Sequence, residues 1–247
     1  MGKINLMYHD ITSQTGSLSG FYEDDTIILY NTDCTLFEQQ LVALQKEGVN
    51  ENVIFTFDDG GVSLYELAAP LLERYGQKGV FFVPTAYIGT SGFMSEEQIK
   101  DLHKRGHIIG SHSHTHPSNI ASLKYEQILS EWKISLDVLY GIIGEKIDVA
   151  SIPNGYSSPN VIRAAQEAGI STLYTSEPTD CIKIKNNIAM LGRYVILCNS
   201  TADSALKIVE NKGHRYLLHS KWKVLEIIKS ILGPSYEVIK QKIFHRS

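Results

Sequence analysis

The chain has 247 residues, of which 43% are hydrophobic and 20% charged, and its formal net charge is −4 at pH 7. This composition is ordinary for a globular protein, and the length suffices for one large α/β domain or two small ones. Lysines and arginines are spread along the chain apart from a mildly basic C-terminal end, so the charge pattern argues against a nucleic acid partner.

Short β-prone runs recur along the sequence, with helical patterns between them. Strands alternating with helices are typical of βα units around a parallel sheet. Seven or eight such units favour a (β/α) barrel over an open doubly wound sheet, whose GxGxxG fingerprint is absent. The predicted strands lie at residues 4–8, 53–57, 79–83, 107–111, 148–152, 170–175, 193–197 and 215–219.

Several predicted helices have recognisable N-terminal signals. Thr35 with Glu38, and Ser95 with Gln98, are capping-box pairs, while Ser158 precedes a proline at the first helical position. No linker rich in proline, glycine or serine divides the chain, and no internal repeat is present. We therefore expect one domain over residues 1–247.

The end of the chain, residues 222–247, carries two amphipathic helical patterns broken at Gly233-Pro234. Apolar residues at helical spacing are usually core, so we expect this segment to pack on the barrel exterior as a helical extension. A partner-binding or membrane-surface role is the alternative.

Cysteine usage and the N-terminus bear on the cellular compartment. Cys34, Cys181 and Cys198 are odd in number and form no CxxC pair, so the sequence indicates neither a disulfide framework nor a cysteine metal site. No run approaches the about 18 apolar residues of a spanning helix, and the first apolar run is too short for a signal-peptide core. The prediction is a cytosolic protein.

Acidic and imidazole side chains follow two of the predicted strands. Asp58 and Asp59 come directly after strand 53–57, and "HSHTHP", which contains His112 and His116, follows strand 107–111. Functional groups of parallel α/β folds collect at the carboxyl ends of strands. Two imidazoles and one carboxylate would give three ligands and one open position, as in catalytic zinc sites.

The adjacent aspartates need a break in the strand to share one site, because neighbouring residues of a strand face opposite ways. Gly60-Gly61 permits that break. One aspartate would then ligate the metal while the other accepts a proton from the metal-bound water. A divalent cation makes such a water acidic and polarises a carbonyl, so an amide or ester is the natural target.

"TFDDG", "HSHTH" and "PNG", in that order, with "FFVPTAYIG" and "KRGHIIGSHSHTHP" between them, resemble the polysaccharide deacetylase family, also called carbohydrate esterase family four, with its NodB-homology domain. The resemblance runs from "LMYHD" to about Tyr174. It implies a distorted (β/α) barrel and metal-dependent removal of an N-acetyl, sometimes O-acetyl, group from a sugar, usually with zinc. It also implies that Asp58 is the general base and that Asp59, His112 and His116 are the metal ligands.

The third motif departs from the family pattern. That motif usually reads Arg-x-Pro-Tyr-Gly and its arginine holds the catalytic aspartate, but here Ser151 replaces the arginine and Asn154 replaces the tyrosine. We expect Arg193, at or just before a late strand, to pair with Asp58 instead. Outward solvation of Arg193 is the alternative.

The remaining expected site residues come from strand ends and from the resemblance. The family's last motif ends a hydrophobic strand with a histidine that protonates the leaving amine, and "RYLLH" makes His219 the candidate, with His214 as a competitor at the wrong end of that strand. Tyr156 either covers a sugar face or only packs. The expected substrate-binding residues are His9, Asp10, Pro153, Asn154, Gly155 and Tyr156.

Three functions remain open at this point. The first is removal of acetyl from an N-acetylated sugar, with a nucleotide-linked or lipid-linked precursor more plausible than a finished wall polymer. The second is hydrolysis of a small non-sugar amide. The third is a carbohydrate-binding relative that keeps the metal site and has lost turnover. Zinc is the expected ion, although these ligand types also accept other divalent transition metals.

Overall fold

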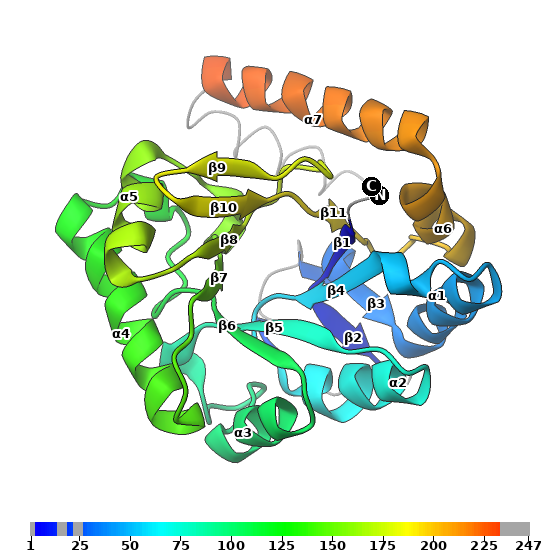
Figure 1. Ribbon diagram of the computed structural model, residues 1–247, viewed down its shortest axis with the longest axis horizontal. Coiled ribbons are helices and arrows are strands. Elements are labelled where there is room, and N and C mark those ends of the chain that lie inside the picture. Colours follow the sequence, from blue (N-terminus) through cyan, green and yellow to red (C-terminus); the bar gives the residue numbers. More distant parts are fainter. Residues whose placement is uncertain (1–2, 14–18, 22–26, 233–247) are drawn as a thin grey trace.

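A computed structural model of the protein describes residues 3–13, 19–21 and 27–232. Within them, nine strands form one sheet that curls into a half-barrel (Figure 1). Neighbouring strands are parallel except for β9 and β10, which confirms the predicted distorted barrel. From edge to edge the strands are β11 (Tyr194–Val195), β1 (Ile4–Tyr8), β4 (Val53–Phe57), β5 (Gly79–Val83), β6 (Ile108–Ser111), β7 (Val149–Ser151), β8 (Thr172–Tyr174), β10 (Ile188–Leu191) and β9 (Lys183–Lys185).

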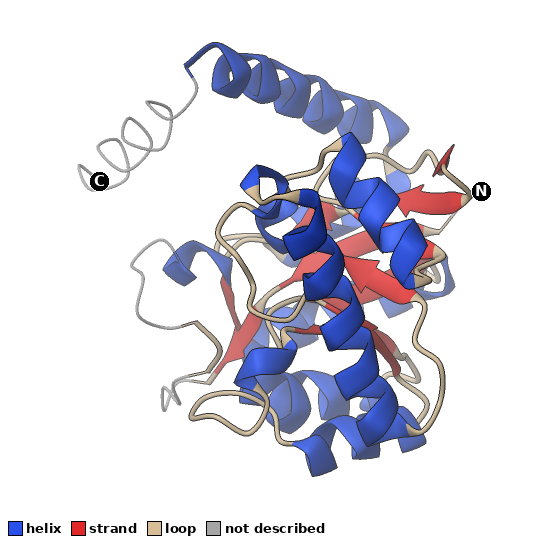
Figure 2. Ribbon diagram, turned by 90° about the vertical axis from the view of Figure 1, so that its left-hand side faces the viewer, coloured by secondary structure: helices blue, strands red, loops and turns tan. Residues whose placement is uncertain are grey.

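Helices cover the outer side of the half-barrel, and α7 lies along its top edge above β9 and β10 (Figures 1 and 2). The predicted capping box forms at the start of α3, where Ser95 Oγ accepts from Gln98 N and Gln98 Oε1 accepts from Ser95 N. Helix α1 differs, because Asp33 rather than Thr35 caps it. The helices are α1 (Cys34–Lys46), α2 (Ala69–Arg74), α3 (Glu96–Lys104), α4 (Tyr125–Ile143), α5 (Pro159–Ala168), α6 (Ala202–Glu210) and α7 (Lys212–Leu232). Two short parallel strands, β2 (Asp10–Thr12) and β3 (Asn31–Asp33), form a separate pair.

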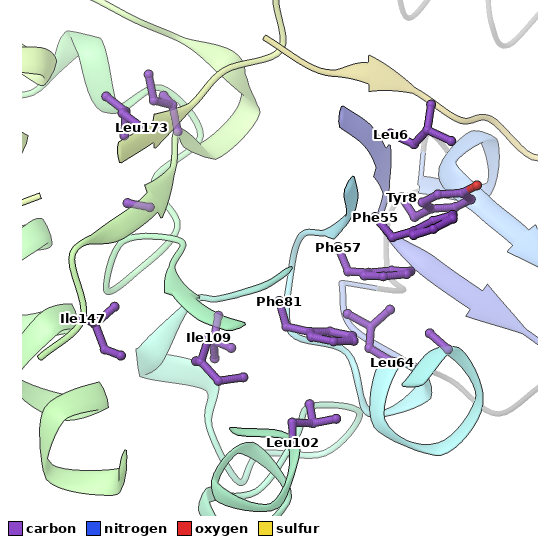
Figure 3. Packing of buried hydrophobic residues seen from close by; sticks show 14 of the residues in the cluster. Leu6, Tyr8, Phe55, Phe57, Leu64, Phe81, Leu102, Ile109, Ile147 and Leu173 are labelled. Atoms are coloured by element: carbon purple, nitrogen blue, oxygen red, sulfur yellow. The ribbon is translucent and has the colours of Figure 1, made fainter. Parts of the chain in front are cut away.

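The main core lies between the sheet and the outer helices, and aromatic rings of neighbouring strands fill part of it. Phe57 stacks on Phe81 with ring centroids 4.9 Å apart, and Tyr8 stacks on Phe57 at 5.4 Å (Figure 3). Because side chains alternate along a strand, the residues beside Phe57 point to the other face, into the half-barrel. That alternation places Thr56 and Asp58 on the inner face.

Strand register brings the chemically informative residues to one edge of the sheet. Tyr8 pairs with Phe57, so the residues after β1 and β4 are neighbours. Val83 pairs with Ser111, and Ser111 pairs with Ala150, so His112 and Ser151 follow at the same level. The loops that carry the predicted site therefore converge.

The predicted strand 215–219 is wrong, because those residues lie within α7. Asn211 Oδ1 accepts a hydrogen bond from His214 N and so caps the first turn of this helix. Periodicity alone does not separate a five-residue apolar run in a helix from one in a strand. The sheet is completed instead by β9 and β10, which the sequence patterns did not predict.

The C-terminal extension predicted over residues 222–247 is described only as far as Leu232, and that part borders the domain at Trp222 and Glu226 while it exposes several apolar side chains. Val224 and Leu225 are 56% and 47% exposed, and Ile228 is 39% exposed. Residues 233–247, the rest of that predicted extension, lie outside the described part of the chain. In the ranges that the structure describes, no helix is both long and apolar enough to cross a bilayer.

Candidate active site

A backbone break after β4 turns two adjacent carboxylates toward one site. Asp58 N still donates to Tyr8 O at 3.0 Å, so Asp58 keeps its inward direction. Strand alternation would turn Asp59 outward, but its φ of 70° is in the left-handed region, and Gly60 follows with a φ of 66°. Such a φ is uncommon for a residue other than glycine and is concentrated at functional sites. The predicted break is thus present, and it begins at Asp59 itself.

The loop after β6 is shaped by similar backbone conformations and by a carboxylate. Ser113 and His116 have φ values of 62° and 51°, and Ser113 Oγ accepts from His116 N at 3.2 Å. Glu131 on α4 accepts from the backbone N–H groups of His114 and Thr115 at 2.9 and 2.8 Å. The His114 ring contacts Thr85 Oγ1 and takes no part in the cluster around the acidic pair.

These two breaks place one carboxylate between two imidazoles. Asp59 Oδ1 lies 3.3 Å from His112 Nε2 and 3.4 Å from His116 Nε2, and the three donor atoms all lie within 4.8 Å of one another. Burial raises the pKa of Asp59, but hydrogen bonds from the two histidines outweigh it and hold that pKa well below its usual range. An ionised carboxylate with two ring nitrogens fits a divalent transition metal.

Ser151, which replaces the family's arginine, orients His112. The Nδ1 atom of His112 lies 2.6 Å from Ser151 Oγ and 3.2 Å from the Ser151 carbonyl oxygen. A carbonyl only accepts, so Nδ1 is the donor to Ser151 and the ring is oriented with Nε2 toward Asp59. The same hydroxyl donates to Asp58 at 3.3 Å. Ser151 therefore links the candidate metal ligands to the second aspartate.

Arg193 forms the predicted pair with Asp58, which confirms that contact. Its NH1 and NH2 atoms lie 2.6 and 2.8 Å from the two Asp58 oxygens, and both side chains are buried. Arg193 directly precedes β11, and Nε donates to Thr175 O at 3.2 Å, which holds the guanidinium plane. Burial raises the pKa of Asp58, but the charges of Arg193 and His112 outweigh it, so the pKa is lowered and Asp58 stays ionised.

The structure separates the two histidines expected to contact substrate or supply a proton. His219 lies on α7, where Nε2 is 2.9 Å from Glu177 Oε1, so the strand-end position on which its assignment rested does not exist. His9, expected only to line the pocket, follows β1 and lies within electrostatic reach of Asp58 and Asp59. Burial lowers the pKa of His9, with the two aspartates opposing that effect. Its Nδ1 is buried and has no hydrogen-bond partner among the described residues.

Asp10, the neighbour of His9, is held by the protein rather than directed at the cluster. Its carboxylate accepts from Ser63 Oγ and from Ile11 N, and burial raises its pKa to about 6. His9, which follows β1, therefore lies near the site, and Asp10, the first residue of β2, is held in the supporting structure.

The "PNG" segment forms a short turn after β7, where Asn154 and Gly155 have φ values of 54° and 72°. Pro153 is buried, Asn154 is exposed and Tyr156 is half-buried. Gly155 borders a cavity of about 540 Å³ that extends to Trp222 on α7. None of the residues of the Asp58 and Asp59 cluster lines this cavity.

The fold and the donor set together define a half-barrel with a candidate metal centre at the carboxyl ends of its strands. The model of the polysaccharide deacetylase family matches residues 45–173, which include Asp58, Asp59, His112 and His116. The chain belongs to the polysaccharide deacetylase family.

Individual relatives agree with this membership. YxkH of Bacillus subtilis (strain 168) is 29% identical over 179 residues, which is 70% of this chain and 64% of YxkH. The peptidoglycan-N-acetylmuramic acid deacetylase PdaA of the same organism is 28% identical over 174 residues, 69% of this chain and 60% of PdaA. The chain thus spans less than two thirds of either relative.

Among solved structures, the Streptococcus pyogenes deacetylase PplD, determined in complex with acetate, superposes with a TM-score of 0.72. The superposition covers 85% of this chain and 99% of PplD at 22% sequence identity. At that identity the likeness establishes the shared fold, and the chemistry has to be argued from this chain's own residues.

Proposed function

We propose that the protein is a metal-dependent hydrolase that removes an N-acetyl, or an O-acetyl, group from a sugar or glycan precursor. One observation carries the proposal: two adjacent aspartates have unlike partners. Asp59 faces two imidazoles, and Asp58 forms a bidentate pair with Arg193. These different surroundings suit a reaction in which one aspartate binds the metal and its neighbour acts as the base.

Asp59, His112 and His116 would hold the ion, for which zinc is expected from the ligand types and the family. When bound, such an ion polarises the acetyl carbonyl and makes a water molecule acidic at neutral pH. Ser151 holds the His112 ring so that Nε2 faces the ligand set. Partners of this kind, behind a ligating histidine, fix its tautomer and raise metal affinity.

Asp58 is proposed as the base that takes a proton from the attacking water. Each carboxylate oxygen has two lone pairs, so both can accept from Arg193 and still accept a proton-bearing partner. Arg193 fixes the orientation of the carboxylate and keeps it ionised.

His9 is proposed as the residue that donates a proton to the leaving nitrogen. It follows β1 within electrostatic reach of both aspartates, and burial lowers its pKa, so its protonated form is a stronger acid. His219 hydrogen-bonds instead to Glu177, which lines the 540 Å³ cavity that none of the Asp58 and Asp59 cluster lines.

Acetate release tests these assignments. The substrates are N-acetylglucosamine oligomers and peptidoglycan glycan strands, since one relative is named for an N-acetylmuramic acid, with bound metal quantified in every sample. Asp58→Asn and His9→Gln are expected to lower kcat by about 10²–10⁴-fold with metal retained. His219→Gln is the matched control and is expected to keep kcat within about twofold.

Full activity in Asp58→Asn would refute the assignment of the base. A kcat loss in His219→Gln and not in His9→Gln would return the acid role to His219. Metal-loaded protein that releases no acetate from sugars or small amides would favour a binding protein over an enzyme.

A further inference from the structure

Helix α7 rests on the domain in part through polar side chains. Arg215 is almost fully buried, pairs with Asp180 at 3.1 Å and donates to two carbonyl oxygens at the end of α6. One turn later, His219 hydrogen-bonds to Glu177, and its ring lies 6.2 Å from that of Trp222, which borders the 540 Å³ cavity. Leu218 packs against the hydrophobic core on the same side, so the side of α7 that faces the protein combines polar contacts with Leu218 and Trp222.

The opposite side of α7 is apolar and exposed. Leu217, Val224 and Ile228 lie on one face, at spacings of seven and four residues, with exposures of 49%, 56% and 39%. Leu225 and Tyr216 flank them, at 47% and 74%. A helix at the surface of a globular protein normally turns its apolar stripe inward. Here the stripe points away from the domain, and both views show α7 at the outer edge of the molecule (Figures 1 and 2).

The chain is acidic up to residue 211 and basic after it, and this charge distribution favours an anionic partner for the exposed face of α7. Residues 1–211 carry 15 Lys and Arg against 25 Asp and Glu, a net charge of −10, whereas residues 212–247 carry 8 against 2, a net charge of +6. Lys221 and Lys223 are exposed beside the apolar stripe. Glu226 is the one acidic residue of α7. An apolar stripe with lysines beside it is the pattern of a helix that lies in a membrane interface.

We propose that the face of α7 defined by Leu217, Val224 and Ile228 docks on an anionic lipid surface. The apolar side chains would enter the boundary between headgroups and acyl chains, and Lys221 and Lys223 would meet the headgroup charges. The acidic body of the protein, on the other side of α7, would then point away from the bilayer. A second copy of the chain is a poorer fit, because joining two α7 faces would bring like-charged lysines together.

Vesicle flotation of the full chain tests the proposal, which does not depend on the proposed activity. The vesicles are phosphatidylcholine alone and an equal mixture of phosphatidylcholine and phosphatidylglycerol. Wild type should bind the anionic vesicles and lose that binding in high salt. Val224→Gln with Ile228→Gln, and separately Lys221→Gln with Lys223→Gln, should each weaken binding by about tenfold or more.

The matched control is Val42→Gln with Ile134→Gln, two apolar residues that are 45% and 41% exposed on α1 and α4, and it should bind like wild type. Circular dichroism confirms that each variant is folded, and acetate release from soluble oligomers should be unchanged by all of them. Wild type that binds neither vesicle, binds both equally, or binds regardless of the α7 variants would overturn the proposal. The proposal would also be overturned if light scattering shows a dimer, if Val224→Gln with Ile228→Gln dissociates that dimer, and if no vesicle binding is seen.

Discussion

Two regions of the chain contribute to the site by different routes. Residues 45–173, matched by the family model, supply Asp58, Asp59 and two histidines through short motifs at strand ends. The region after residue 173 supplies Arg193 without a motif, through the pairing of β11 with β1. A buried carboxylate needs a cationic partner in a fixed geometry, but that partner can enter from any strand that reaches the same edge of the sheet. Asp58 therefore requires an arginine in contact with its carboxylate, and that arginine need not come from the third motif.

The largest expected effect follows from removing Arg193, the contribution of the region after residue 173. Arg193→Met should lower the free energy of unfolding by about 3–5 kcal/mol, because Asp58 would remain buried without its cation. Acetate release should fall by about 10²-fold or more, since the base would no longer be held. Urea unfolding and initial rates measure both quantities.

Two further variants test whether the effect comes from the buried ion pair itself. Arg105→Met, at a half-exposed ion pair with Glu73, should cost about 1 kcal/mol and leave the rate unchanged. Asp58→Asn added to Arg193→Met should regain part of the lost stability without restoring activity. If Arg193→Met is as stable as wild type, the buried pair does not have the importance assigned to it.

The next effect concerns the backbone that places Arg193. A Cβ atom at Gly192 would lie 2.4 Å from the Glu177 carbonyl oxygen, and Arg193 N donates to that same oxygen. Gly192→Ala should therefore destabilise the protein by up to about 3 kcal/mol and lower activity. Gly141→Ala, in α4 with open space around it, should instead be neutral or slightly stabilising. Equal thermal midpoints for the two variants would contradict this account of the β10–β11 turn.

A smaller effect, on metal affinity, is expected at Ser151, where residues 45–173 depart from the family pattern. Ser151→Ala removes the hydroxyl that contacts both His112 and Asp58 and should weaken metal binding by about 10–100-fold. Ser135→Ala, which breaks a buried hydroxyl pair with Ser111 and touches no candidate ligand, should leave metal affinity unchanged. Isothermal titration with zinc compares them, and equal affinities in the two variants would show that Ser151 only fills space.

The smallest effect is a pH dependence of stability away from the site. Hydrogen bonds from Arg105, with burial opposing, lower the pKa of Glu73 from 4.5 to about 2. A depressed folded-state pKa stabilises the protein above the unfolded-state value, and that stability is lost as the pH falls from 4.5 toward 2. Glu73→Gln should cost about 1 kcal/mol at neutral pH, because Glu73 is partly exposed, and the difference from wild type should vanish near pH 2.

Urea unfolding over that pH range measures the difference. Exposed Glu51→Gln serves as the control and should parallel wild type throughout. A difference for Glu73→Gln that persists unchanged at pH 2 would show that its contribution is not electrostatic.

The sequence predicted more of the site in residues 45–173 than of the structure after residue 173. Strand-end position was enough to bring the two aspartates near the histidines, and Gly60-Gly61 indicated the break that lets both aspartates share one site. The prediction of Arg193 came from the resemblance, because Ser151 stands where the family has its arginine. "RYLLH" was misassigned because its apolar run fits a helix as well as a strand, and the capping by Asn211 that decides it is a local contact. The β9–β10 hairpin did have a signal, the turn pair Asn186-Asn187, whose φ values are 48° and 61°.

The C-terminal helix shows a different limit. Its amphipathic pattern correctly indicates which residues share a face, but periodicity does not say which way the face points. Here the buried Arg215 and the His219–Glu177 contact hold one side of the helix against the domain. Leu217, Val224 and Ile228 lie on the opposite side and therefore face outward.

The central claim is the division of labour between Asp58 and Asp59, and the crystal structure of the zinc-loaded protein, with anomalous scattering to locate the ion, tests it most directly. The account predicts one peak bound by Asp59, His112 Nε2 and His116 Nε2, with Asp58 still paired to Arg193 and not coordinated. An ion coordinated by Asp58, with Arg193 displaced from it, would contradict the claim.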